Sequence, residues 1–507
     1  MVRGNTSPMS GAHDASAATL SRSGHGPTST RAGSRRRGRL GLAACLAAVG
    51  LLASACGSNH GSSDGSRTTG ANTTTTAGGD TGGATKFGTL ASPCGKGDAK
   101  GSTAKGVTDS DITIGYGDDA GYAAAPGLDK EMTDAMKAMI GWCNDQGGIN
   151  GRQVKGNYYD GKVTDVGKAI AQACTDNVFM LVGQGWVFDS GQEQARIKCE
   201  LPSIPGYAVS TAFSHGPGVI QPIPSPGDET PASFAFELAD KFPDAVKKAA
   251  FVYADYPATK ETRDKYAAAF PKAGWKFQDC DQKYNIQGES DWKPIADNLK
   301  ACGSEVVVWV GSPNPNFENF LAAAKQEGFE PKAWLSDANS YDSSFAKWNA
   351  DNDGAADNVY IRLATVPFED ADTVPAVKLY SDLIDKEKGT KALLGVQATS
   401  AFLLWATGVQ ACGSDVTRKC VFDEVKKQTA WTAGGLHAPT NPGANVPPSC
   451  GVLIQMDGGD FKQVVPTKTG FDCNDKYLVK GLKTDALTQA KLDGDRVATE
   501  YGTFTVK

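Results

Sequence analysis

Short apolar runs alternate with longer amphipathic segments along most of the chain from residue 107 onward. The run Asp111–Tyr116 is β-branched, and residues 128–143 then repeat apolar side chains at spacings of three and four. Further apolar runs at residues 178–182, 249–253 and 306–310 are each followed by a segment with helical spacing. Strands flanked by helices at this interval predict a parallel sheet that is covered on both faces.

The alternation is interrupted once, by a proline-rich segment at residues 216–231, and begins again at Ala249. Two similar α/β units joined by a crossover predict two doubly wound parallel-sheet lobes with a multi-strand hinge. Val359–Leu363 and the apolar helix Leu393–Val409 are expected to return the chain to the first lobe. The expected division is residues 107–222 for the first lobe, 223–354 for the second lobe, 355–450 for the return to the first lobe, and 451–507 for a C-terminal strand and tail partly in the second lobe.

The segment Trp142–Val154 has three glycines within five residues, which is also a feature of phosphate-binding loops. Phosphate-binding glycines precede a helix, where free N–H groups face the anion, whereas these glycines follow one. Gly147 or Gly148 can end the helix in a left-handed conformation, and Asn150-Gly151 is a turn dipeptide before the next strand. The segment therefore predicts a turn between helix and strand.

The first 90 residues have the composition of an export signal and a tether. A basic cluster at Arg35–Arg39 precedes an apolar run, Leu40–Leu52, and small residues then lead to Cys56. The run has 13 residues, fewer than the roughly 20 that span a bilayer as a helix. We expect residues 1–55 to be a removed signal peptide and residues 56–90 a disordered tether, because the latter are mostly Gly, Ser, Thr, Asn and Ala.

Charge and cysteine content limit the possible partners. The formal net charge is −6, and removing residues 1–55, with seven Arg and one Asp, makes it about −12. An acidic body argues against nucleic acid and anionic lipid as partners. Ten cysteines would remain after Cys56, an even number that favours up to five disulfides outside the cytoplasm. No CxxC pair or Cys/His cluster predicts a metal site, and no cofactor is expected.

The candidate chemistry favours a binding protein over an enzyme. The exported body has only His60, His215 and His437, and it contains no G-x-S-x-G, H-E-x-x-H or P-loop motif. With 57 Asp and Glu, chance pairs of carboxylates are common, so no acid/base pair can be singled out. A hydrolase that uses scattered carboxylates stays an alternative.

The glycine segment reads N-x-x-G-G-I-N-G-R from Asn144 to Arg152, and with its preceding helix it resembles the periplasmic binding proteins for branched-chain amino acids. The resemblance covers residues 107–465 and extends to the loop after Val182 and to Asp255-Tyr256. It implies a two-lobed fold, a small-molecule ligand, the permease subunits of an ABC importer as partners, and a monomer. Cys174 and Cys199 resemble a disulfide pair that recurs in this family.

Leu51–Ser58 also resembles the lipobox of bacterial lipoproteins, although Ala53 stands where that family prefers Leu. The resemblance implies that Cys56 becomes lipidated and is the new amino terminus. The protein would then be exported and held at the outer face of the cell membrane by this lipid alone.

In doubly wound sheets, ligands lie beyond the carboxyl ends of the strands, so we expect a cleft between the lobes. It would be lined by the loops after Ile114, Val182, Ile204, Tyr253, Val310 and Leu335. Candidate ligand-binding residues are Gln184, Trp186, Tyr207 and Ser210 in the first lobe, Tyr256, Asn314 and Asp337 in the second, and Tyr116, Asp118 and Tyr122 as further candidates. Trp186 and Tyr256 can also pack at a loop base, and Asp337 can instead cap a helix.

The sequence thus predicts an extracytoplasmic solute-binding lipoprotein that captures a small molecule for an ABC importer. An amino acid or a related compound is the default ligand. The aromatic loop Gly183–Phe188 can also stack on a planar or apolar ligand. A ligand-sensing receptor subunit without transport is the main alternative, because the same fold serves both.

Overall fold

The computed structural model describes residues 86–311, 313–485 and 502–507, and all of them belong to one compact unit. The predicted signal peptide, Cys56 and most of the predicted tether lie outside these residues. The tether was expected to reach residue 90, but β1 (Lys86–Phe87) already pairs with β2 (Leu90–Ala91). Phe87 is fully buried and packs edge-on against Trp142, so ordered structure begins before residue 90.

The first lobe is built on a four-stranded parallel sheet with the order β4-β3-β5-β6. The longest pairing joins β3 (Asp111–Asp118) to β4 (Gln153–Asp160) in register over eight residues. On the other side of β3 lie the short strands β5 (Leu181–Val182) and β6 (Ser203–Ile204). All four strands therefore end at the same edge of the sheet.

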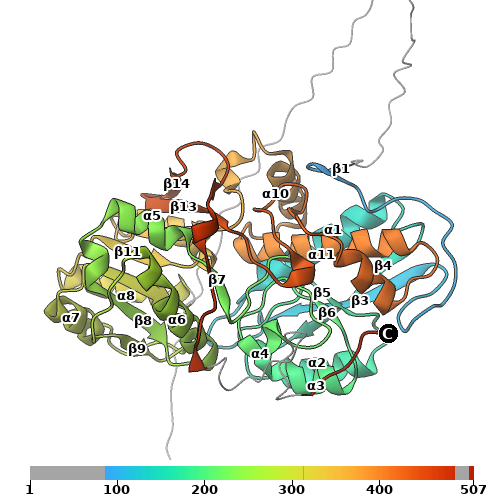
Figure 1. The fold of residues 1–507 in the computed structure, drawn as a ribbon, viewed down its shortest axis with the longest axis horizontal. Helices are drawn as coiled ribbons and strands as arrows, with labels where there is room; N and C mark the ends of the chain where they lie inside the picture. Colours follow the sequence, from blue (N-terminus) through green and yellow to red (C-terminus); the bar gives the residue numbers. More distant parts are fainter. Residues whose placement is uncertain (1–85, 312, 486–501) are drawn as a thin grey trace, which may run out of the picture. The chain divides into compact units, whose positions relative to one another are not determined.

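Helices from two distant parts of the chain cover this sheet. The sequence-local helices are α1 (Lys130–Asp145), α2 (Val166–Thr175), α3 (Glu193–Lys198) and α4 (Thr211–Ser214). Later helices of the same lobe are α10 (Pro375–Glu387), α11 (Leu393–Cys412) and α12 (Arg418–Val425). In Figure 1, α11 lies beside α1, and contacts between these helices join the two parts of the chain. Helix α11 therefore packs against the first helix of this lobe.

The glycine segment is a turn, as predicted. Helix α1 ends at Asp145, Gly147 and Gly148 have φ values of 109° and 80°, and β4 begins at Gln153. A Cβ on Gly148 would lie 2.0 Å from the backbone oxygen of Arg152, so only glycine fits there. The fully buried Arg152 side chain donates hydrogen bonds to four backbone oxygens, those of Thr108, Gly101, Gly413 and Ser414.

The second lobe contains a larger sheet with the order β14-β13-β12-β11-β10-β8-β9. Its parallel strands are β8 (Ala249–Ala254), β9 (Gln282–Tyr284), β10 (Val306–Val310), β11 (Ala333–Ser336) and β12 (Val359–Leu363). Strands β13 (Cys450–Asp457) and β14 (Asp460–Val465) are antiparallel at one edge. The expected placement of Val359–Leu363 in the first lobe was wrong, because this strand pairs with β11.

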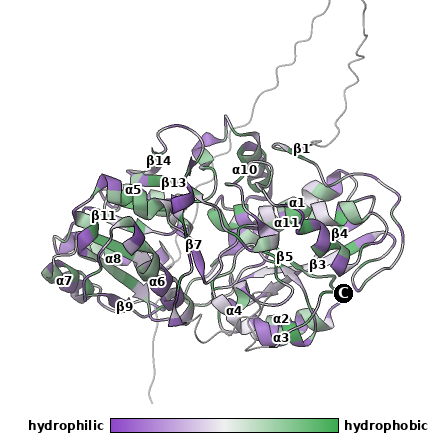
Figure 2. Cartoon of the chain, viewed as in Figure 1, coloured by the Kyte–Doolittle hydropathy of each residue, from purple (hydrophilic) through white to green (hydrophobic). Residues whose placement is uncertain are grey.

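Side chains of β10 show that both faces of this sheet are covered. Val307 and Trp309 belong to one apolar cluster, together with residues of α7 (Lys293–Cys302) and α8 (Glu318–Gln326). Val306, Val308 and Val310 belong to another, with residues of α5 (Ser233–Lys241) and α6 (Pro257–Ala269). In Figure 2 hydrophobic residues are prominent around β11 and α8. Burial on both faces explains the continuous apolar run at 306–310 and confirms the predicted fold class.

Within the residues that the structure describes, three segments connect the lobes. The first contains β7 (Glu229–Pro231), which pairs with β16 (Leu478–Lys480). The second follows β12, and the third precedes β13; they meet where Thr365 pairs with His437. The connection between the lobes is therefore a multi-strand hinge, as the fold class predicted.

Five disulfides link the ten cysteines of the body, and one of them is the expected Cys174–Cys199 bond. The other pairs are Cys94–Cys143, Cys280–Cys302, Cys412–Cys420 and Cys450–Cys473. The last residues of the chain lie on the first lobe, where Phe504 contacts the guanidinium of Arg196. None of the helices within the described ranges is long and apolar enough to cross a membrane.

Candidate functional site

A cavity of about 290 Å³ lies between the lobes, at the carboxyl ends of the strands of both sheets. Each of the six loops named from the sequence contributes to its wall, from Tyr122 after β3 to Asp337 after β11. Residues of the segments that connect the lobes (the crossing segments), including Ile223 and Thr365, complete the wall. Both lobes and the hinge therefore enclose the same space, which is a common position for a ligand in a two-lobed protein.

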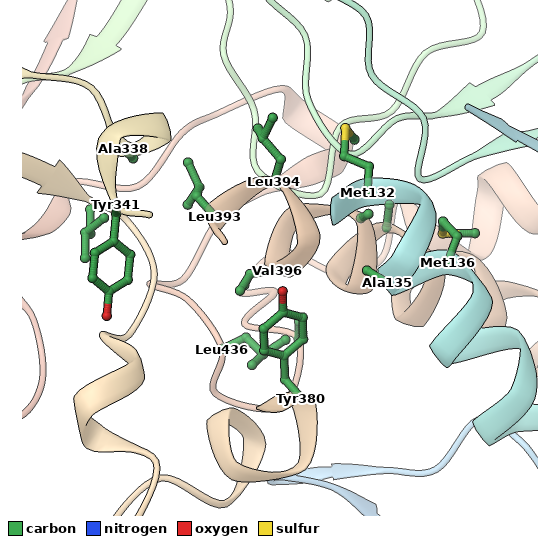
Figure 3. Close-up of a cluster of buried hydrophobic side chains, with 14 of the residues drawn as sticks. Met132, Ala135, Met136, Ala338, Tyr341, Tyr380, Leu393, Leu394, Val396 and Leu436 are labelled. Carbon is green, nitrogen blue, oxygen red and sulfur yellow. The ribbon is translucent and has the colours of Figure 1, made fainter. Parts of the chain in front are cut away.

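Much of the cavity wall is apolar. The aliphatic side chains that line it are Leu128, Val163, Val187, Val209, Ile223, Ile286, Val310, Leu393 and Leu394, together with several alanines and prolines. Figure 3 shows Leu393 and Leu394 at the beginning of α11, close to Met132 of α1. This part of the wall is continuous with the buried core of the protein.

In the first lobe, two buried carboxyl groups hold loops that line the cavity. Asp119 accepts hydrogen bonds from the N–H groups of Val163 (2.5 Å) and Val187 (2.7 Å), so it joins the loops after β4 and β5. Asp189 accepts from Val209 (2.6 Å) and so fixes the loop after β6. Burial raises the pKa of Asp119 to about 6 and that of Asp189 to about 7. The lining residues Val163, Val187 and Val209 are thus held by carboxyl groups that do not themselves line the cavity.

Four of the ten predicted ligand-binding residues line the cavity: Tyr122, Tyr207, Asn314 and Asp337. The Tyr207 hydroxyl donates to Asp129 Oδ2 (2.9 Å), and Asn314 Nδ2 donates to Ser344 Oγ (2.9 Å). The structure brings these four together from both lobes.

Three first-lobe candidates are directed into the protein interior instead. Gln184 is fully buried and donates to the hydroxyl of Ser203. Trp186 is also fully buried, and its Nε1 donates to the backbone oxygen of Asp118 (2.9 Å). Ser210 caps α4 by accepting from Phe213 N (3.2 Å). Their loops reach the cavity, but these side chains do not line it, because each has a partner inside the lobe.

Tyr116 and Asp118 are also placed away from the cavity. Tyr116 is buried beside Tyr158, with ring centroids 5.9 Å apart. Asp118 accepts a hydrogen bond from the Tyr158 hydroxyl (2.6 Å). Both residues are within β3, which extends to residue 118 rather than ending at Tyr116, and this extension keeps them in the sheet.

Tyr256 lies at the junction of the lobes rather than on the cavity wall. Its ring meets that of Phe188 in the first lobe edge-on, with centroids 5.7 Å apart. A second contact joins the lobes nearby, where Glu261 of α6 accepts a hydrogen bond from Thr211 N of α4 (2.7 Å). These two contacts connect the lobes on the α6 side of the cavity.

The sequence analysis missed three charged lining residues: Asp129, Lys265 and Arg362. Arg362 could have been identified from the sequence, because it is the one charged residue in the apolar strand Val359–Leu363. Lys265 lies among other charged residues of α6 and Asp129 lies at the start of α1, so both resemble ordinary surface positions in the sequence.

Arg362 and Asp337 form an ion pair at the second-lobe side of the cavity. Arg362 Nε lies 2.7 Å from Asp337 Oδ1, which also accepts from the Tyr266 hydroxyl (2.8 Å). Burial alone would lower the pKa of Arg362, but Asp337 and Tyr266 raise it above its ordinary value. This guanidinium is therefore charged and already paired.

Lys265 is only 9 % exposed, and its Nζ donates to Ser225 Oγ and to the backbone oxygen of Pro226, both at 3.3 Å. Burial lowers the pKa of Lys265 to about 8, and the charge of Arg362 adds to this effect. On the first-lobe side, burial raises the pKa of Asp129 well above its usual range, with Glu131 and Asp119 adding. The cavity thus presents an amine in one lobe and a carboxyl group in the other.

The described part of the chain contains no group of three or more His, Cys, Asp or Glu residues that could hold a metal ion.

Comparison with known proteins gives a family match over most of the body. The model of a family described as periplasmic binding protein matches residues 111–460. A search of curated proteins found no match.

Several solved structures have a similar fold. A fatty acid ABC transporter substrate-binding protein from Thermomonospora curvata is 17% identical, with a TM-score of 0.60, over 76% of this chain and 97% of that one. A leucine binding protein, LivK, from Thermotoga maritima is 14% identical, with a TM-score of 0.57, over 72% and 99%. LivJ from Streptococcus pneumoniae, solved with isoleucine, is 14% identical, with a TM-score of 0.53, over 70% and 99%. At these identities the likeness shows the fold.

Proposed function

The chain belongs to the periplasmic binding protein family, and from this premise we propose that it captures a small solute in the interlobe cavity for an ABC importer. The family match spans more than half of the chain and agrees with the resemblance found in the sequence. The observation that carries the proposal is the cavity itself, whose wall is contributed by both lobes and by the segments that connect them.

The cavity supports a solute with a substantial apolar part. Aliphatic side chains from both lobes form much of the wall, and burial of apolar surface is the main favourable term in such sites. An amino acid with an apolar side chain and a fatty acid both have this property, and each is named for a structure of similar fold. Our default is an amino acid or a related compound.

A thermal-shift screen of small solutes, followed by calorimetry, tests this proposal. A solute that binds should raise the melting temperature, and Thr262→Trp should abolish binding, because Thr262 lines the cavity from α6. Lys260→Trp on the same helix is the matched control, since Lys260 is exposed and does not line the cavity. Binding that survives Thr262→Trp unchanged would place the site elsewhere.

Transport and sensing can be separated in cells. If the protein serves an importer, deleting its gene should abolish high-affinity uptake of the labelled solute. Unchanged uptake together with a lost transcriptional response to the solute would instead indicate a sensing receptor.

We further propose that the protein is an exported monomer anchored by lipid at Cys56. Small residues before Cys56 and the polar segment after it support this. Cys56→Ala should release the protein from membranes or leave it unprocessed. Mature protein that stays in the membrane fraction after this change would contradict the lipid anchor.

A further inference from the structure

Lys265 is the cation of the cavity wall whose contacts are weakest. Its Nζ has two acceptors, a hydroxyl and a backbone carbonyl, each at the long distance of 3.3 Å. Across the described ranges no carboxylate oxygen lies within ion-pair distance of this nitrogen. A buried ammonium without an anionic partner is costly, and an anion that enters the cavity would offset that cost.

The acidic groups that face Lys265 are engaged elsewhere. Asp337, after β11, is paired with Arg362 and Tyr266. Glu261, on the same helix, accepts from Thr211 N across the lobes. Asp228, in the first crossing segment, lies 3.7 Å from His215. The anion that completes the coordination of Lys265 is therefore absent from its surroundings in the protein.

The other lining residues near α6 indicate what such an anion is attached to. Ala258 and Thr259 precede Lys265 on the cavity side of the helix, and Ile223, Ile286 and Val310 line the same cavity from other elements. These side chains offer apolar contact and little hydrogen bonding. A ligand whose anionic end reaches Lys265 therefore meets mainly apolar side chains next to that end.

We propose that the solute carries a carboxylate that binds Lys265 Nζ in the second lobe, with its apolar body against the aliphatic wall. This rests on the proposed function of the cavity and names the ligand class and the residue that recognises it. The same chemistry is present in an aliphatic carboxylic acid and in an apolar amino acid.

The test compares carboxylates with uncharged analogues by calorimetry on the purified protein at pH 7. The probes are octanoate, 4-methylpentanoate and L-leucine, with octanamide, 4-methylpentanamide and leucinamide as their counterparts. We expect at least one acid to bind and its amide to bind at least about tenfold more weakly, as for a lost charge-assisted hydrogen bond. Preference for 4-methylpentanoate over L-leucine would assign an aliphatic acid, and the reverse an amino acid.

Binding measurements on variants of Lys265 test whether this residue contacts the carboxylate of the ligand. Lys265→Met keeps an unbranched side chain that is one atom shorter and uncharged, and it should weaken binding of the best acid at least about tenfold, whereas Lys265→Arg should retain most of the affinity. Lys260→Met, at an exposed position of α6, is the matched control and should change nothing. Equal affinity of wild type and Lys265→Met for the acid would overturn the proposal.

Proton linkage gives a readout that does not depend on a variant. Because the pKa of Lys265 is lowered to about 8, a bound carboxylate should raise it, and binding at pH 8.5 should take up a proton. Calorimetry in two buffers of different ionisation enthalpy measures this uptake, and affinity should fall as the pH rises above 8. No proton uptake and a pH-independent affinity would overturn the assignment to Lys265.

The remaining outcomes separate this inference from the proposed function. If an uncharged or cationic solute binds and Thr262→Trp abolishes that binding, the cavity is the solute site and the carboxylate inference is wrong. If no solute from the wider screen binds the cavity, both proposals are contradicted.

Discussion

Glu261 in the second lobe accepts a hydrogen bond from the backbone N–H of Thr211 in the first lobe, at 2.7 Å. If the lobes open about the crossing segments, this is a contact of the closed arrangement only. Glu261→Ala should then lower the affinity for the solute about fivefold to tenfold, the range of a charge-assisted hydrogen bond that is partly exposed. The melting temperature without solute should stay nearly unchanged.

Asp264→Ala is the control for this change, because Asp264 lies on the same helix and its ion pairs among the described residues are with Lys260 and Arg263 of that helix. Calorimetry gives the affinities, and small-angle scattering with and without solute reports how closed each variant is. An equal loss of affinity in both variants would show that the effect comes from α6 as a whole.

Tyr256 should act on closure through its edge-on contact with Phe188. Tyr256→Ala removes this interlobe contact, so we expect the affinity to fall by about 1–3 kcal/mol, as for an aromatic anchor in a desolvated contact. Tyr256→Phe keeps the ring and should bind nearly as the wild type does. A comparable loss of stability without solute, with affinity unchanged, would identify Tyr256 as a core residue.

Glu237 should make stability depend on pH. Its side chain on α5 is buried, and burial raises its pKa from 4.5 to about 8, with Asp472 and Asp240 adding to the shift. Between pH 4.5 and pH 8 the carboxyl group of Glu237 is therefore protonated in the folded state and ionised in the unfolded state. The free energy of unfolding should therefore fall as the pH rises from about 4.5 to about 8, and level off above that.

Glu237→Gln should remove this dependence and stabilise the protein at pH 8 by on the order of 4 kcal/mol relative to the wild type. Urea unfolding of both proteins from pH 5 to pH 9 measures it, and the difference between them isolates Glu237 from other titrating groups. Parallel curves for the two proteins would show that this carboxyl group does not titrate as expected.

The disulfide Cys174–Cys199 should contribute measurably to stability. It closes a loop of 25 residues, for which the chain-entropy relation gives on the order of 3 kcal/mol. The double change to serine should lower the free energy of unfolding by about that amount. The same change at Cys412 and Cys420, which are 8 residues apart, should cost about 1 kcal/mol less. An equal cost at both sites would show that loop length does not set the effect.

The fold was predictable because its signals are local. The run Val306–Val310 is buried on both faces, and an apolar sequence of that length already predicts such a strand. Gly147 and Gly148 likewise identify the end of a helix without reference to the rest of the chain. Assigning Val359–Leu363 to a lobe failed because a strand's apolar pattern does not determine which sheet edge it joins.

The site was predictable at the level of loops but not of side chains. Both Trp186 and Tyr207 follow first-lobe strands, yet Trp186 donates to the backbone of Asp118 inside the lobe and Tyr207 reaches the cavity. Which way a loop side chain points depends on the hydrogen-bond partners that the fold brings near it. The same holds for Lys265, whose cavity-facing position depends on how α6 is rotated against the hinge.

The order of the disulfides has a consequence for biogenesis. Each of the ten cysteines is bonded to its immediate neighbour along the chain, with separations of 49, 25, 22, 8 and 23 residues from the amino end onward. If the polypeptide is oxidised as it emerges, amino end first, the complete native set forms when every second cysteine of the body joins the unpaired cysteine just before it. In that order of emergence, the nearest unpaired cysteine is always the native partner, so sequential pairing favours the native disulfides.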